Sequence, residues 1–400
     1  MLFLTHTGQI GGAEMCLLAL APQFGGDVLA FQPGPLGERL AGLGVRMIKP
    51  DRPLDLSAVK RDQGLLRVFR SLGGVARLMR QIIREARLHD LVYCNSQKGF
   101  VLGAMARPLH RVPLLWHLHD ILDRRHFGAG QIRLVVALAN RMAAGVVAPS
   151  QAVAAAFIRA GGRPGLVRIV ANGVASDPVL PERPRAAEDD RRSGSDPQRD
   201  DPVAARQVLG LPAGPLVGVF SRLAPWKGQH VLLEALSRLP GVGCLVVGGA
   251  LFGEEHYGRS LERLAEHLGI QDRIRFLGHR NDVATLMRAV DVVVHPSVAA
   301  EPFGLTLVEA MHAGTPLVAS SGGAADEILD GGTLGVLVPP DDAGRLAEAI
   351  AWCFDNPSLA TSRAQRARRQ ARRRYDLAGY RSAIAALVVR HARGRAKQAA

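Results

Sequence analysis

Two glutamates eight positions apart, Glu301 and Glu309, are the residues of this 400-residue chain that best suit the binding of hydroxyl groups. Pro302 keeps Glu301 in extended backbone and out of a helix. The apolar spacing of Leu305–Ala313 predicts a helix that stops at Gly314 and carries Glu309 in its early turns. One carboxylate is therefore expected in a loop and the other on a helix, both just after a predicted strand.

This pair of carboxylates fits a ligand that carries both hydroxyl groups and phosphate. Carboxylate oxygens accept hydrogen bonds from sugar and ribose hydroxyls. The backbone of Phe303, Gly304 and Leu305 leads into the start of the helix, where N–H groups are available to a phosphate. An alternative is that Glu309 only complements the helix dipole.

Two cations, Arg222 and Lys227, lie in the segment Ser221–Gly228, between a predicted strand at 216–220 and a helix that begins near Gln229. Arginine grips phosphate oxygens with two parallel hydrogen bonds, and lysine supplies a mobile point charge. Two cations beside a helix N-terminus predict a diphosphate site. The alternative is a pair of solvated loop cations.

A glycine-rich turn, with Gly11 and Gly12, follows the first predicted strand and leads into an apolar helix. Strand-to-helix turns at the carboxyl edge of a parallel sheet are where such folds bind ligands. The sequence is not GxGxxG, so a plain turn remains an alternative to a loop that contacts phosphate or sugar.

Short apolar runs alternate with longer segments of helical period, which predicts an α/β fold of parallel strands joined by crossover helices. Each half contains enough strands for its own doubly wound sheet. The expected strands are 2–5, 28–31, 45–48, 91–94, 114–119, 145–148 and 167–170 in the first half, and 216–220, 243–247, 274–277, 292–295, 317–319 and 335–338 in the second.

The segment 182–202 has twelve charged residues in twenty-one and no large apolar side chain, so it cannot offset its ordering entropy by burial. We therefore expect a first domain at 1–181, a flexible linker at 182–205, a second domain at 206–375, and a C-terminal helix with a basic tail at 376–400.

The net charge of +14 is unevenly distributed along the chain. Residues 1–181 carry 22 basic and 11 acidic side chains, residues 203–362 carry 11 and 17, and residues 363–400 carry 12 and 1. The acidic second half and the 5% aromatic content argue against a nucleic-acid binder. Four dispersed cysteines indicate neither a disulfide framework nor a zinc site.

Five motifs in this order resemble the retaining glycosyltransferases of family four. They are Gly-Gly-Ala-Glu14, Ser-Arg222-Leu-Ala-Pro-Trp-Lys227-Gly, Phe276-Leu-Gly-His, His295-Pro-Ser and Glu301-Pro-Phe-Gly…Glu309. The resemblance spans nearly the whole chain and implies a GT-B fold, with two Rossmann-like domains and a C-terminal helix that returns to the first. It also implies that the second domain holds the nucleotide sugar and the first holds the acceptor.

The resemblance assigns roles to individual residues. Arg222 and Lys227 would hold the donor diphosphate, Glu309 the ribose hydroxyls and Glu301 the transferred sugar. The loop Gly278-His279-Arg280 would contact the base through its backbone.

A histidine of the first domain is implied at the reaction centre. The segment 113–120 contains His117 and His119, and alignment of the motif favours His119. The two side chains point to the same face by strand alternation, so one of them is expected to be a buried structural histidine.

The resemblance implies transfer with retention from a nucleotide sugar. We expect a UDP- or GDP-sugar as the donor and a lipid-linked or saccharide acceptor, in the synthesis of cell-envelope polysaccharide, lipopolysaccharide or glycolipid. No metal is expected, because the Asp pairs at 189–190 and 200–201 fall in the linker and the cations stabilise the leaving group. We expect a cytoplasmic enzyme, peripheral on an anionic inner membrane face through its basic first domain and tail. A sugar-nucleotide epimerase and a non-catalytic sugar-nucleotide sensor are the alternatives.

Overall fold

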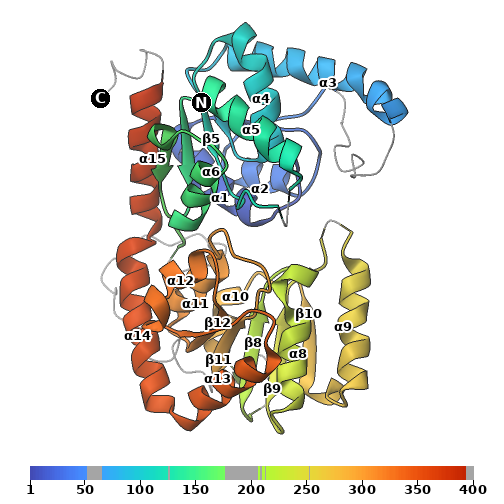
Figure 1. Cartoon of the computed structure of the whole chain (residues 1–400), viewed down its shortest axis with the longest axis vertical. Helices are drawn as coiled ribbons and strands as arrows, with labels where there is room; N and C mark the ends of the chain where they lie inside the picture. The colour runs from blue at the N-terminus through green and yellow to red at the C-terminus, as the bar shows by residue number, and fades with distance from the viewer. Residues whose placement is uncertain are drawn as a thin grey trace, which may run out of the picture. The chain divides into compact units, whose positions relative to one another are not determined.

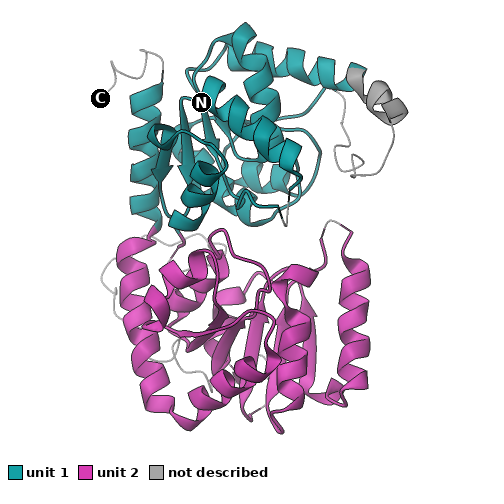
Figure 2. Ribbon diagram, in the orientation of Figure 1, with its two compact units in different colours: residues 1–173, 377–400 teal, residues 174–376 magenta. Residues whose placement is uncertain are grey.

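The computed structural model describes residues 1–51, 65–124, 127–175, 206–207, 210–211, 213–251 and 253–392. The predicted linker at 182–205 and the last part of the predicted C-terminal segment, 393–400, lie outside the described residues. Two units result, the first formed by Met1–Gly173 with Leu377–Ala400 and the second by Val174–Asp376 (Figure 2).

Figure 1 shows the helices and strands of the chain. The first unit is built on a seven-stranded parallel sheet in the order β3-β2-β1-β4-β5-β6-β7. Its strands are β1 (Leu2–Thr5), β2 (Asp27–Ala30), β3 (Met47–Ile48), β4 (Val92–Cys94), β5 (Leu114–His117), β6 (Gly145–Ala148) and β7 (Val167–Ile169). Its helices are α1 (Gly12–Leu20), α2 (Leu36–Gly42), α3 (Leu65–Ala86), α4 (Gln97–His110), α5 (Ala129–Met142), α6 (Gln151–Arg159) and α15 (Leu377–His391).

Helices cover both faces of this sheet, and its central strands β1, β4 and β5 are therefore buried at every position. Helix α4 packs against both α3 and α5, whereas α1 packs against α2 and α15. On the α4 side, the rings of Phe100 and Trp116 stack with their centroids 4.2 Å apart.

The C-terminal helix α15 belongs to the core of the first unit. Its Tyr380 and Ile384 are buried in one cluster with Phe3 and Leu17. Arg381 adds a hydrogen bond from its Nε to the carbonyl oxygen of Ala19, at 2.8 Å. The expected return of a C-terminal helix to the first sheet is confirmed.

The second unit has a six-stranded parallel sheet in the order β10-β9-β8-β11-β12-β13. Its strands are β8 (Leu216–Phe220), β9 (Gly243–Val247), β10 (Ile274–Gly278), β11 (Val292–His295), β12 (Leu317–Ser320) and β13 (Val336–Val338). Its helices are α8 (Gln229–Ser237), α9 (Glu255–His267), α10 (Val283–Ala289), α11 (Leu305–Ala313), α12 (Ala324–Ile328), α13 (Ala343–Asp355) and α14 (Pro357–Arg374).

Helix α14 contains the arginine-rich segment 363–374. Its alanines at 360, 364, 367 and 371 are buried, and the helix packs against α11. The arginine-rich segment 363–374 is therefore part of the second unit, not of the tail that returns to the first. The alanine spacing follows the helical period, so one face of α14 is apolar although the segment is strongly basic.

All thirteen predicted strands are present, and the α/β fold with two doubly wound sheets is confirmed. Several strands are shorter than expected, and one of these differences bears on the site. The run predicted at 114–119 ends as a strand at His117, so His119 lies beyond the sheet edge rather than within β5.

Candidate active site

The order of strands in the second unit reverses between β8 and β11, which lie side by side in the sheet. Open α/β sheets bind ligands outside the carboxyl ends of their strands at such a switch point. The segment after β8 contains Arg222 and Lys227, and the segment after β11 contains Glu301. Two motifs that are far apart in the sequence thus meet at one edge.

The backbone holds these two segments together. The N–H of Val298 donates to the carbonyl oxygen of Trp226 at 2.9 Å. Gly228 has a positive φ of 70°, and a Cβ there would collide with the carbonyl oxygen of Pro296. Only glycine allows this close approach, so Gly228 fixes the distance between the cationic loop and the loop that carries Glu301.

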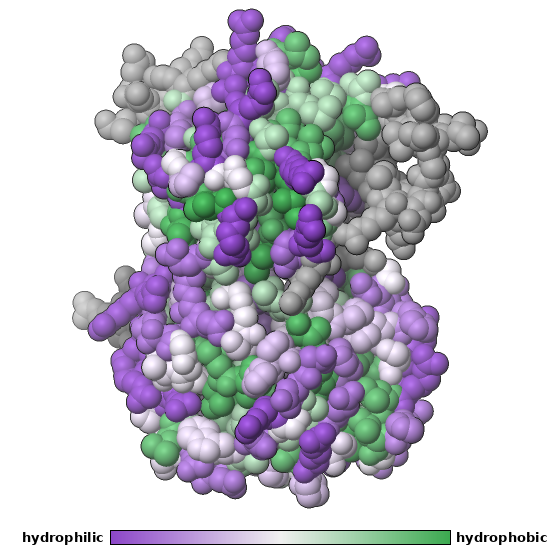
Figure 3. Space-filling model, in the orientation of Figure 1, coloured by the Kyte–Doolittle hydropathy of each residue, from purple (hydrophilic) through white to green (hydrophobic). Residues whose placement is uncertain are grey.

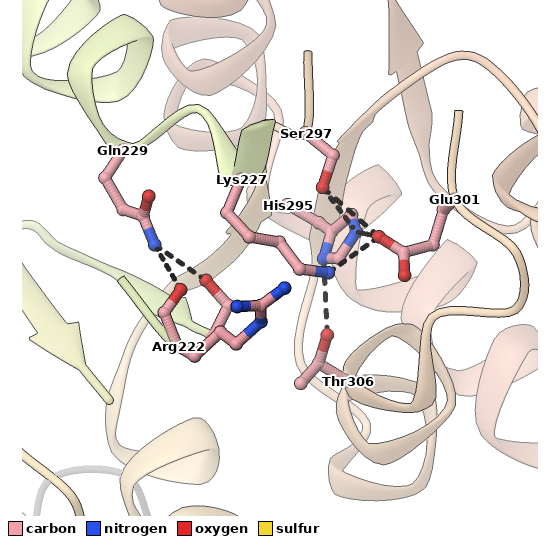
Figure 4. A network of polar contacts seen from close by, with 8 residues as sticks. Arg222, Lys227, Gln229, His295, Ser297, Glu301 and Thr306 are labelled. Carbon is pink, nitrogen blue, oxygen red and sulfur yellow. Dashed lines mark hydrogen bonds and ion pairs between the residues drawn. The ribbon is translucent and has the colours of Figure 1, made fainter. Parts of the chain in front are cut away.

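Lys227 and Glu301 form a buried ion pair between these loops. Lys227 Nζ lies 2.7 Å from Glu301 Oε2, and the two side chains are 11% and 9% exposed (Figure 4). Although burial alone would raise it, the charge of Lys227 and the hydrogen bond with His295 hold the pKa of Glu301 well below its usual value. The carboxylate is therefore ionised throughout the physiological pH range.

Three further side chains fix Glu301 and its neighbours, and the sequence analysis assigned none of them a role. His295 Nε2 lies 3.1 Å from Glu301 Oε2, and Ser297 Oγ donates to the same oxygen at 3.3 Å. Thr306 Oγ1 lies 3.2 Å from His295 Nδ1 on the other side of the ring. The motif His295-Pro-Ser297 was visible in the sequence, but its partners were not.

Arg222 and Lys227 share one aromatic neighbour. The Arg222 guanidinium carbon lies 5.4 Å from the ring centroid of Trp226, and Lys227 Nζ lies 4.1 Å from it. Gln229, buried at the start of α8, donates from Nε2 to Ser221 Oγ and to the carbonyl oxygen of Arg222, both at 2.9 Å. The loop that carries both cations is thereby preorganised.

Glu309 lies on α11, as predicted, and it is partly buried. Burial raises its pKa to about 7. Within the described part of the chain, no hydrogen bond or ion pair to its carboxylate is found. At Gly304, which precedes this helix with a φ of 79°, a Cβ would press against Leu307 and Glu301.

The remaining predicted donor residues contribute in different ways. Gly278 ends β10, and the exposed Arg280 side chain is held by Asp282 through bonds of 2.8 and 2.6 Å. Phe303 is buried, with its ring centroid 5.9 Å from that of Tyr375, and Leu305 is half-buried. His279 is exposed. The side chains of Arg280 and Phe303 thus make contacts within the protein.

The first unit has its own switch point, between β1 and β4. Gly11 precedes α1, and Gly12 is its first residue. The buried Glu14 accepts hydrogen bonds from Gly11 N–H at 3.2 Å and from Thr5 Oγ1 at 3.1 Å, and burial raises its pKa. Glu14 closes the glycine turn, a role that the motif Gly-Gly-Ala-Glu14 contained but the sequence analysis did not assign.

The two candidate histidines occupy different environments. His117 is wholly buried, and its Nδ1 lies 3.0 Å from Tyr93 Oη. His119 is partly exposed beyond the strand end, and its Nε2 lies 3.2 Å from Asn95 Oδ1. This geometry favours His119 over His117 as the residue that a substrate can reach. Among the described residues, no group of three or more potential metal ligands is found.

Comparison with known proteins identifies the class. The family described as Glycosyl transferases group 1 matches residues 204–374, and the Glycosyl transferase 4-like domain matches residues 12–173. HepE of Anabaena, solved with UDP and glucose, is 36% identical with a TM-score of 0.84, over 97% of this chain and 98% of that one. This chain belongs to the group 1 glycosyltransferases and has their GT-B fold, which confirms the resemblance seen in its sequence.

Two other relatives show how far the similarity extends. D-inositol 3-phosphate glycosyltransferase of Mycolicibacterium smegmatis is 40% identical over 164 residues, which are 40% of this chain and 38% of that protein. The match thus spans less than half the length of that curated relative. Sucrose-phosphate synthase of Thermosynechococcus elongatus, 21% identical with a TM-score of 0.77 over 97% of this chain and 98% of that one, shares the fold.

Proposed function

We propose that this glycosyltransferase takes a UDP-sugar, with a hexose such as glucose, as its donor and transfers the sugar with retention of configuration. The observation that supports this most is the set of Arg222, Lys227, Glu301 and Glu309 at one switch point, in a chain similar over almost its full length to HepE, which was solved with UDP-glucose.

The proposed roles follow from the chemistry of each group. Arg222 and Lys227 bind the diphosphate, because they are cations on a preorganised loop before α8. Glu309 accepts hydrogen bonds from the ribose, since its carboxylate has no partner among the described residues. The backbone of Gly278–Arg280 contacts the base, and that of Phe303–Leu305 contacts phosphate at the start of α11.

Departure of the diphosphate needs positive charge that is already in place. Arg222, Lys227 and the positive end of the α11 dipole supply it as fixed potential. We propose that this replaces a metal ion. The acceptor hydroxyl then attacks the sugar on the side from which the diphosphate leaves.

Glu301 suits sugar binding better than nucleophilic attack. Its Oε2 is held by Lys227, His295 and Ser297 at 2.7 to 3.3 Å. A carboxylate oxygen that accepts several hydrogen bonds is stabilised as an anion and loses nucleophilicity. Glu301 therefore orients the hydroxyls of the transferred sugar, and His119 in the first unit acts at the reaction centre.

A turnover assay tests this function and separates it from its alternatives. With UDP-glucose, release of UDP that depends on an added lipid-linked or saccharide acceptor is expected. Turnover to a new UDP-sugar without acceptor would favour an epimerase instead. Tight binding of UDP-glucose without any product would favour a sugar-nucleotide sensor.

For the acceptor side, we propose contact between the first unit and an anionic membrane surface. The sequence of this unit carries 27 Lys and Arg against 10 Asp and Glu, net +17, whereas the second unit carries 23 against 26, net −3. Each Lys or Arg near an anionic bilayer contributes about 1 kcal/mol. The described residues include no helix that is long and apolar enough to cross a membrane.

The helices α4 and α5 offer exposed apolar side chains for this contact. Met105 and Leu109 on α4 are 50% and 59% exposed, and Leu134 on α5 is 55% exposed. The exposed Arg87 donates to the carbonyl oxygen of Leu109 at 2.9 Å, so one basic side chain lies beside these apolar residues. Figure 3 shows apolar surface in the region of α4 and α5 with hydrophilic side chains around it. An acceptor with a lipid carrier would be presented at such a surface.

A further inference from the structure

Asn95, at the carboxyl end of β4, connects the glycine turn to His119. It is fully buried, and its own backbone N–H donates to the carbonyl oxygen of Leu4 at 2.8 Å. Its side-chain Nδ2 donates to the carbonyl oxygen of Ala13 at 2.9 Å, and its Oδ1 lies 3.2 Å from His119 Nε2. The backbone bond and both ends of the side chain fix Asn95 in one orientation.

The position of the Ala13 carbonyl determines where the proton of His119 lies. A carbonyl oxygen only accepts, so the amide NH₂ of Asn95 must face Ala13. The opposite end of the amide is then the oxygen, which also only accepts. His119 Nε2 must therefore carry the ring proton and donate it to Asn95.

The second ring nitrogen of His119 is left as an acceptor. Burial lowers the pKa of His119 to about 3, so the ring is neutral and Nδ1 bears no proton at physiological pH. Among the described residues, Asn95 is the one that forms a hydrogen bond with this ring. The adjacent His117 ring, with its centroid 3.8 Å away and a tilt of 35°, holds the plane of His119.

We propose that Asn95 is a positioning residue that locks His119 as the neutral Nε2–H tautomer, so that Nδ1 accepts a hydrogen bond from a substrate hydroxyl. This inference rests on the proposed place of His119 at the reaction centre. It assigns His119 the task of orienting a hydroxyl rather than removing its proton, because so weak a base gains little from proton transfer near neutral pH.

The tautomer can be measured without any turnover. In protein labelled with ¹⁵N-histidine, two-bond ¹H–¹⁵N correlations distinguish Nδ1–H, Nε2–H and doubly protonated rings, and the His119→Gln variant identifies the signals of His119. The expected pattern at pH 8 is that of an Nε2–H ring. An Nδ1–H ring or an imidazolium would overturn the inference and leave the proposed glycosyl transfer untouched.

Variants at position 95 test the positioning role. Asn95→Leu removes the acceptor, so we expect a mixture of His119 tautomers and a kcat reduced about tenfold with unchanged UDP affinity. Asn95→Asp keeps an acceptor oxygen and should restore the Nε2–H signal. Asn140→Leu is the matched control, because Asn140 also bridges two backbone groups, Gly161 and Arg163, but contacts no histidine.

The failure of the inference and that of the proposed function are distinguishable. A locked tautomer that persists in Asn95→Leu would refute the role of Asn95 alone. Full activity of His119→Ala would instead refute the proposed place of His119 at the reaction centre, whichever tautomer the wild-type ring adopts.

Discussion

Lys227 Nζ lies 2.7 Å from Glu301 Oε2, across the switch point of the second sheet. Removing one partner of such a buried pair leaves the other charge uncompensated, which typically costs about 3 to 5 kcal/mol. The pair therefore fixes, before any substrate binds, the positions of the cation that we propose for the diphosphate and of the anion that we propose for the sugar hydroxyls.

The Glu301→Gln substitution should separate catalysis from nucleotide binding. We expect kcat to fall by about 100-fold or more, because the oriented carboxylate is lost from the sugar. UDP affinity should remain, since Glu301 is assigned to the sugar and not to the nucleotide. Steady-state kinetics and UDP titration measure the two effects. Glu348→Gln, in an exposed pair with Arg345, is the matched control. Unchanged turnover in Glu301→Gln would refute the assignment of Glu301 to the transferred sugar.

Binding of UDP-glucose should release protons near pH 7 through Glu309. Its pKa is raised to about 7 in the free protein, and hydrogen bonds from ribose favour the ionised form, so binding lowers this pKa. The affinity for UDP-glucose should therefore rise as the pH increases from 6 to 8. Calorimetry in buffers of different ionisation enthalpy measures the protons released. The Glu309→Gln variant should lose this pH dependence, and its persistence there would assign the protons to another group.

Turnover should continue when metal ions are chelated. The proposed stabilisation of the departing diphosphate comes from Arg222, Lys227 and the start of α11, none of which needs a metal. Assays in EDTA, with and without added Mg²⁺ or Mn²⁺, test this. Complete loss of activity that is restored by either ion would refute the proposed stabilisation.

Binding to liposomes should require anionic lipid and weaken with salt, because the Debye length shortens from about 10 Å at 0.1 M. The fraction of protein that sediments with anionic liposomes should decrease in a Met105→Ser, Leu109→Ser double variant. Leu359→Ser is the matched control, since Leu359 is 60% exposed on α14 of the second unit. Equal binding to neutral and anionic vesicles, or none at low salt, would refute the membrane proposal.

The elements were predictable from sequence where a local pattern decides the structure. Buried parallel strands are short apolar runs bounded by Gly, Pro, Ser or Asn, so all thirteen were found. The early end of β5 was not predictable, because the apolar Leu118 continues the run after His117. Only the backbone N–H of Leu118 still bonds to the neighbouring strand, donating to the carbonyl oxygen of Val147 at 2.9 Å.

The motifs of the candidate site were predictable, but their connections were not. Arg222, Lys227, Glu301 and Glu309 stand in recognisable motifs. Their supporting residues, such as Gln229 and Asn95, are single buried polar side chains whose partners depend on how distant strands pair. Lys227 and Glu301 are 74 positions apart, and no local pattern indicates that they touch.

Titration of UDP into the wild type and Arg222→Ala tests the central claim most directly, because the donor diphosphate is assigned to Arg222 and Lys227. Arg222 is preferable to Lys227 for this test, since its loss does not leave Glu301 without its buried partner. The account predicts binding to the wild type in EDTA and a loss of about 1.5 to 3 kcal/mol in Arg222→Ala. Arg238→Ala, at the opposite end of α8, should bind like the wild type. Equal UDP affinity in the wild type and Arg222→Ala, or no UDP binding by the wild type, would contradict the assignment.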